Sequence, residues 1–306
     1  NEDNESVVSG FTIRGGYINC GAGIYCTTSS PTIQNCVISN NTAGSGGGIY
    51  LLGSSATIKK CTVRENSGGG ISCNPHEFLS DPNKIQYWVT GCSPLIEQCD
   101  IEDNAGAGIY MNGTYLTYLW GNMCSGCPYE SLPKVLKCRI AGNSSDGVSA
   151  GYEVEALLEN CAVIKNSGRG IYSFLSELTV RNCTIAQNHS ADYGAGIYGI
   201  FDLSKGFIKV ENSIVWGNSP NTSQIAADGS GSAHSTADYT DYDPTEYFPG
   251  DFDNDIVFGS GNITNDPLLC CDGQHIQSGS PCINAANPAW APAVDIDGES
   301  RNTDMG

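Results

Sequence analysis

The residues best suited to chemistry are acidic and lie toward the C-terminus. Asp251, Asp253 and Asp255 alternate with other residues, a spacing that can wrap oxygen ligands around a Ca²⁺ ion. Asp295 and Asp297, within VDIDGE, form a second pair of this kind. A solvated acidic surface that aids solubility is the alternative interpretation. Ca²⁺ is therefore the one cofactor that the sequence suggests, at one or both clusters.

Aromatic residues that could stack on sugar rings lie in two long insertions, residues 74–92 and 112–133. The residues predicted to contact a glycan or a partner are Tyr87 and Trp88 in the first insertion and Tyr115, Tyr118 and Trp120 in the second. Binding residues are often carried by loops on a rigid scaffold. Alternatively, these rings pack on one another as a small satellite core.

The chain has 15 cysteines, and six of them fall at one position of a repeat described below, where a free thiol packs as a small hydrophobic group. Others lie in the insertions and near the C-terminus and are candidates for disulfides in an oxidising compartment. The candidates are Cys73 with Cys92, Cys124 with Cys127, and Cys282 with Cys270 or Cys271.

Composition narrows the classes of function. The chain has 306 residues and a net charge of −19, which argues against nucleic acid as a partner because phosphates attract Lys and Arg. No stretch of 18 apolar residues occurs, so no membrane span is expected. The opening NEDNES, without a Met, fits either a processed mature form or a trimmed chain. The four histidines share no spacing typical of a metal site or a catalytic triad, and we predict no catalytic residue.

The elements that must position these residues follow from an internal repeat. The unit is G-[AG]-G-I-Y, a variable stretch, and then x-I-x-[NKQ]-C-x-[IV]-x-x-N. Apolar residues alternate with period two, which predicts three short strands in each coil. A coil of this size cannot bury its own apolar face and must stack on its neighbours. Residues at equivalent positions should therefore lie above one another, and several acidic and basic residues, such as Glu159, Arg181 and Glu211, should then pair.

Two rows of the repeat carry most of this prediction. The cysteine row is Cys36, Cys61, Cys99, Cys138, Cys161 and Cys183, with Ser213 at its end. The asparagine row is Asn41, Asn66, Asn104, Asn143, Asn166, Asn188 and Asn218. We predict that asparagine recurs because it tolerates a left-handed backbone and because stacked side chains can hydrogen-bond between coils.

Coils such as GAGIYCTTSSPTIQNCVISNNT resemble the parallel β-helix repeat of pectate-lyase-like proteins and of secreted bacterial surface proteins. The resemblance implies an all-β, right-handed, single-stranded parallel β-helix, a solenoid, over residues 1–218. Residues 219–306 are expected to be an acidic, loop-rich segment that caps the last coil. They resemble the closing segment of surface proteins that often continue into a variable anchor.

Three classes of function are compatible with this fold. The regular coils and paired charges favour a secreted or cell-surface structural protein without enzymatic activity: a stalk, an adhesin or a filament subunit that self-associates end to end. A polysaccharide lyase or glycoside hydrolase of the pectate-lyase-like fold is the alternative, although the negative charge would repel an acidic polymer. A module that binds surface glycans without catalysis is the third.

Overall fold

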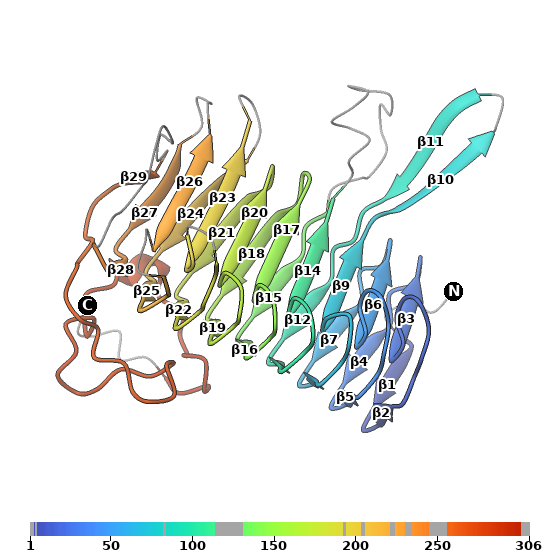
Figure 1. The fold of residues 1–306 in the computed structure, drawn as a ribbon, viewed down its shortest axis with the longest axis horizontal. Coiled ribbons are helices and arrows are strands. Elements are labelled where there is room, and N and C mark those ends of the chain that lie inside the picture. The colour runs from blue at the N-terminus through green and yellow to red at the C-terminus, as the bar shows by residue number, and fades with distance from the viewer. Residues whose placement is uncertain are drawn as a thin grey trace.

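A computed structural model of the chain describes residues 3, 5–81, 84–113, 131–191, 194–202, 206–220, 224–229, 234–244 and 256–300, and it leaves out the side chains of residues 77–89. It is a right-handed parallel β-helix, in which three parallel sheets run the length of a rod (Figure 1). Each coil contributes one strand to each sheet, so neighbouring strands of a sheet come from successive coils. The prediction of an all-β solenoid is confirmed.

Sheet one has the order β1 (Val7–Ser9), β4 (Thr32–Gln34), β7 (Thr57–Lys59), β12 (Leu95–Glu97), β15 (Lys134–Leu136), β18 (Glu155–Glu159), β21 (Glu177–Arg181), β24 (Phe207–Glu211), β27 (Ser235–Asp238), β29 (Ile256–Phe258). Sheet two has the order β2 (Thr12–Arg14), β5 (Val37–Ser39), β8 (Thr62–Arg64), β13 (Asp100–Glu102), β16 (Arg139–Ala141), β19 (Ala162–Ile164), β22 (Thr184–Ala186), β25 (Ile214–Trp216), β28 (Asp241–Tyr242). Sheet three has the order β3 (Ile24–Thr27), β6 (Ile49–Leu52), β9 (Ile71–Asn74), β14 (Ile109–Asn112), β17 (Val148–Gly151), β20 (Ile171–Phe174), β23 (Ile197–Phe201), β26 (Ile225–Gly229).

The apolar core lies inside the coils, where equivalent residues stack in register. Ile96, for example, pairs with Ile58 on one side and Val135 on the other, and all three are fully buried. Their neighbours along the strands point outward, because successive side chains of a strand alternate between its two faces. The period-two pattern of the sequence therefore becomes a continuous column of Ile and Val along the axis.

The asparagine row forms a buried hydrogen-bonded ladder. The side-chain oxygen of Asn143 accepts from the backbone and side-chain nitrogens of Asn104, at 3.1 and 3.0 Å. Its amide nitrogen donates to the Ile101 carbonyl at 3.1 Å and to Asn166 Oδ1 at 2.9 Å. The predicted bonding between coils is confirmed, because these turns hold polar groups away from water and each needs a partner.

The predicted left-handed backbone of the asparagine row is wrong. The positive φ angles fall one residue earlier, as at Asp103 (53°) and Lys165 (57°), and not at Asn104 or Asn166. A second row of residues with positive φ lies one position before the cysteine row and includes Lys137 and Asn160. Asparagine is thus needed in its own row for its two-sided amide and not for its backbone.

The cysteine row is buried and its thiols are free. The Cys138 sulfur accepts from the backbone nitrogen of Cys99 at 3.5 Å and donates to the Leu136 carbonyl at 3.3 Å. Ser213 takes the same place after Cys183, since its hydroxyl accepts from the Cys183 nitrogen at 3.1 Å. A small side chain that both donates and accepts is what this position requires.

Strand pairing continues past residue 218, where the repeat becomes hard to follow in the sequence. Two substitutions explain the difference. Gln224 Oε1 accepts from the Asn218 backbone and side chain, at 3.0 and 2.8 Å, and so replaces the next asparagine of the ladder. Thr240 follows Ser213 in the cysteine row, and its hydroxyl donates to the Asp238 carbonyl. The last coils therefore reach Phe258 with different residues in the same roles.

The segment from residue 266 to residue 300, called the strap here, lies at the C-terminal end of the rod (Figure 1). It runs along the side of the last coils, over the outer face of sheet two, and contains the short 3-10 helix η1 (Pro288–Trp290). Side chains at one corner of successive coils hold it: Asn160, Asn182 and Asn212 donate to its Val294, Trp290 and Asn287 carbonyls at 2.9, 2.8 and 2.9 Å. This part of residues 219–306, the segment predicted to cap the last coil, thus lies against the side of several coils.

Candidate functional site

An antiparallel hairpin projects from the rod after the third strand of sheet three (Figure 1). It consists of β10 (His76–Asp81) and β11 (Lys84–Thr90), with Leu79 opposite Tyr87 and Phe78 opposite Trp88 in the backbone register. The sequence predicted this insertion without its strands. Tyr87 and Trp88 therefore stand on the hairpin, away from the solenoid. Tyr115, Tyr118 and Trp120 lie outside the described residues, so their predicted role remains a prediction.

Several acidic and basic side chains of successive coils form ion pairs with one another. Arg181 lies between Glu159, at 4.0 Å, and Glu211, at 2.7 Å, as predicted. Arg139 contacts Glu102 at 2.6 Å. These side chains are partly exposed, so each pair stabilises the fold by at most about 1 kcal/mol.

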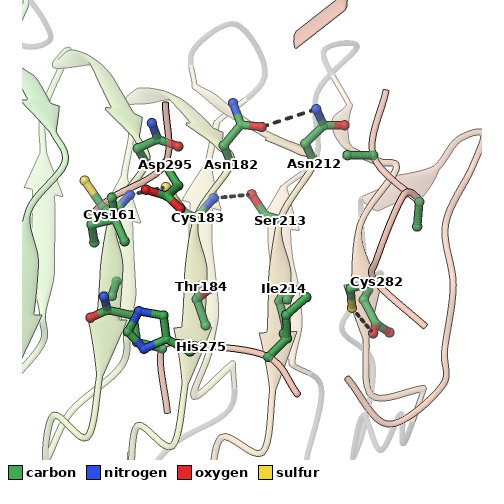
Figure 2. A pocket seen from close by; sticks show the side chains of 18 of the residues that line it. Cys161, Asn182, Cys183, Thr184, Asn212, Ser213, Ile214, His275, Cys282 and Asp295 are labelled. Carbon is green, nitrogen blue, oxygen red and sulfur yellow. Dashed lines mark hydrogen bonds between the residues drawn. The ribbon is translucent and has the colours of Figure 1, made fainter. Parts of the chain in front are cut away.

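A cavity of about 310 Å³ lies between sheet two and the strap (Figure 2). Its floor is made by outward-facing residues of successive coils, including Thr184, Ile214 and Asp241, which follow one another in register. Figure 2 shows Thr184 and Ile214 side by side on neighbouring strands, with His275 and Cys282 of the strap on the other wall. Two distant parts of the chain therefore form one site.

The most unusual group in the cavity is the carboxylate of Asp241, in β28. It is 3% exposed, and its Oδ2 accepts from the Cys282 thiol at 2.9 Å. Its Oδ1 is buried and has no hydrogen-bond partner within the described part of the chain. Burial, with a smaller contribution from the charge of nearby Asp266, raises the pKa of Asp241 to about 6, although the hydrogen bond from Cys282 acts to lower it. Burial beside this carboxylate raises the pKa of Cys282 to about 12.

His275 joins two parts of the strap at the edge of the cavity. Its Nδ1 lies 2.5 Å from Asp272 Oδ2, and its Nε2 lies 2.7 Å from Asp297 Oδ2. The hydrogen bonds with Asp272 and Asp297 raise the pKa of His275 to about 9, so the ring is positively charged at neutral pH. Burial would raise the pKa of Asp272, but hydrogen bonds from His275 and from backbone nitrogens lower it to about 2.

The predicted calcium residues are not brought together by the described structure. Asp251, Asp253 and Asp255 lie outside it. Asp295 Oδ1 accepts from the backbone nitrogens of Asp297 and Glu299, at 3.0 and 2.8 Å, while Asp297 contacts His275. Across the described ranges, no three His, Cys, Asp or Glu side chains are grouped as a metal site would require. Calcium binding remains a prediction.

The disulfide candidates are found in different settings. The buried Cys73 and Cys92 side chains are adjacent and share a hydrogen bond that, together with burial, raises the pKa of Cys73. Cys282 donates to Asp241, and Cys270 and Cys271 lie elsewhere on the strap as free thiols. Cys124 and Cys127 lie outside the described residues. The bonds themselves remain predictions.

Sequence reasoning missed Asp241 and His275 as members of one site. The one available signal was register, because Asp241 follows Thr184 and Ile214 in an outward row of sheet two. No repeat connects that row to His275, so the meeting of the two segments could not be read from the sequence.

The solenoid and its internal rows define a class of protein. A sequence model of the family described as "Right handed beta helix region" matches residues 2–83 and 80–237, and the chain belongs to this family. Among solved structures, it is similar to that of the pectate lyase Pel9A, with 14% identity and a TM-score of 0.54. The match covers 90% of this chain and 64% of that one, and it supports the fold alone. No curated protein matches the sequence.

No helix among the described ranges is long and apolar enough to cross a membrane.

Proposed function

We propose that this chain is an extracellular, non-enzymatic rod that contacts a surface glycan through its projecting hairpin. The observation that carries the proposal is the hairpin β10–β11, which leaves a solenoid of otherwise regular coils and bears Tyr87 and Trp88. Aromatic rings on a protruding element are suited to stack on sugar rings. A rigid rod is suited to hold such an element away from the surface that carries it.

The interior of the rod supports this role. The asparagine ladder and the register of the three sheets join each coil to the next without a break from Asn41 to Asn218. A ladder of this kind resists bending, because each coil is fixed to both of its neighbours. The ion pairs between coils use charges that an active site would need to keep available.

A glycan array tests the proposal. We expect the full chain to bind a subset of glycans, and the double variant Tyr87→Ala, Trp88→Ala to lose at least tenfold in affinity for them. Tyr17→Ala is the matched control, since Tyr17 is 87% exposed on the first coil and its loss leaves the hairpin intact. Equal binding by the double variant and the control would show that the hairpin is not the contact.

An enzyme acting on a polysaccharide is the second candidate. The fold is similar to that of a pectate lyase, and Asp241, with its pKa of about 6, is a carboxyl group that could transfer a proton near neutral pH. Incubation with pectin and with alginate separates the two candidates, because a lyase produces unsaturated ends that absorb in the ultraviolet. Under the proposal made here the absorbance does not rise. A rise that Asp241→Asn abolishes would establish the enzyme instead.

End-to-end association is a further part of the structural role. Electron micrographs of the purified chain at increasing concentration test it: filaments support it, and dispersed monomers at every concentration exclude it.

A further inference from the structure

We propose that the cavity between sheet two and the strap binds a small aliphatic primary amine, with the ammonium group of the ligand donating to Asp241. The proposal does not depend on the role of the hairpin. It rests on a buried carboxylate oxygen without a partner, on the charges around the cavity and on the nature of the cavity walls.

The carboxylate of Asp241 has one oxygen that accepts from no described residue. Asp241 is 3% exposed and lines a space of about 310 Å³, and its buried Oδ1 accepts from no described residue. A buried polar atom without a hydrogen bond is costly, so native proteins rarely keep one. A ligand with an N–H donor beside Asp241 would add a second hydrogen bond to this carboxylate, whose Oδ2 already accepts from the Cys282 thiol.

The charges of the surroundings favour a cation over a neutral or anionic ligand. Asp295 and Asp297 line the cavity, Asp266 raises the pKa of Asp241, and no Lys or Arg is found among the described residues that line the cavity. His275 is the one cationic side chain among the described lining residues, and it contacts two carboxylates already. A donor that carries a positive charge makes a stronger bond to a carboxylate than a neutral donor does.

The walls indicate an organic cation and not a metal ion. Ile214, Ile263 and Ala285 supply apolar surface beside Asp241. A metal would need further ligands, and in the described part of the chain no third acidic, Cys or His side chain joins Asp241 and Cys282 in a metal-binding group. The volume lies at the lower end of the range of small-molecule sites, roughly 300–1,000 Å³, so the ligand is short.

Calorimetric titration of the full chain at pH 8 tests the proposal. Asp241 is charged at this pH, and the probe is butylammonium chloride. We expect saturable binding at one site. We expect no binding of 1-butanol, which has the apolar chain without the charge, and none of tetramethylammonium, which has the charge without an N–H donor. Ca²⁺ titrated in the same way should not compete with butylammonium.

Three variants locate the binding. Asp241→Asn keeps the shape of the side chain and should weaken butylammonium binding at least tenfold. Ala285→Leu leaves Asp241 in place but fills the cavity, and it should also abolish binding. Glu5→Gln changes the net charge by the same amount as Asp241→Asn, on the exposed first coil, and should bind like the original chain. Circular dichroism of each variant checks that the fold is kept.

Several results would overturn the proposal. Absence of butylammonium binding to the original chain would do so directly. Equal binding by Asp241→Asn, or binding of tetramethylammonium as strong as that of butylammonium, would show that the overall negative charge and not the cavity attracts the amine. Displacement of butylammonium by Ca²⁺ would identify a cation site in place of an amine site.

Discussion

Replacing Asn143 by alanine should lower the free energy of unfolding by about 4 kcal/mol, because the substitution removes four buried hydrogen bonds worth about 1 kcal/mol each. Asn143 is fully buried in the middle of the ladder. In the variant, the backbone nitrogen of Asn104 loses its acceptor and the Asn166 side chain loses one of its donors. A methyl group at this position cannot restore either contact, and the turn is too enclosed for water to do so easily.

Equilibrium unfolding in guanidinium chloride, followed by far-ultraviolet circular dichroism, measures the loss. Ser144→Ala is the matched control, since Ser144 is the next residue in the same turn and is exposed. We expect the control to change the free energy of unfolding by less than about 0.5 kcal/mol, as for most surface substitutions. A loss below about 1 kcal/mol for Asn143→Ala would refute the view that the ladder holds the coils together, since it would equal a single ordinary hydrogen bond.

Three further predictions concern the cysteines, the strap and calcium. The cysteine row should be inert to a colorimetric thiol reagent in the native protein and reactive after unfolding. Exposed Cys271 should react at once. Rapid labelling of the whole row in the native state would contradict its burial. The pKa of His275 is raised to about 9, so its contribution to the stability of the strap is fully present below about pH 6.5 and is lost as the pH rises through 9. Amide hydrogen exchange in the strap, corrected for intrinsic rates, should therefore be faster at pH 9.5 than at pH 6, and His275→Gln should remove that difference. If Asp251, Asp253 and Asp255 bind Ca²⁺, its addition to chelator-treated protein should raise the melting temperature, and changing all three to Asn should abolish the rise.

Register explains why so much of the rod was predictable. A row such as Ile58, Ile96 and Val135 needs only the identification of the repeat, because each coil contacts its neighbours in one fixed way. The predicted pairing of Arg181 with Glu159 and Glu211 follows from the same rule. The rule fails where a different residue performs the same task, and this is why the last coils, with Thr240 and Gln224 in these roles, were not recognised.

Register between coils does not predict the site beneath the strap. Its hydrogen bonds join residues far apart in the chain, such as Asn160 with Val294 and Cys282 with Asp241, and no sequence repeat links the two partners. An asparagine in the left-handed corner row looks the same in the sequence whether its amide faces water or the strap. The acidic residues of the strap suggested calcium, yet in the fold Asp297 is bound to His275 and Asp295 to backbone nitrogens.

The sequence by itself determined the solenoid, its three sheets and the residues that fill its core, because a repeating pattern of alternating residues has one way to bury its apolar face. The tertiary structure alone decided where the strap lies, and hence that Asp241, Cys282 and His275 line a common cavity. The physical reason is that stacking between coils is a nearest-neighbour interaction written into every repeat, whereas the docking of the strap depends on the outer surface that several coils form together.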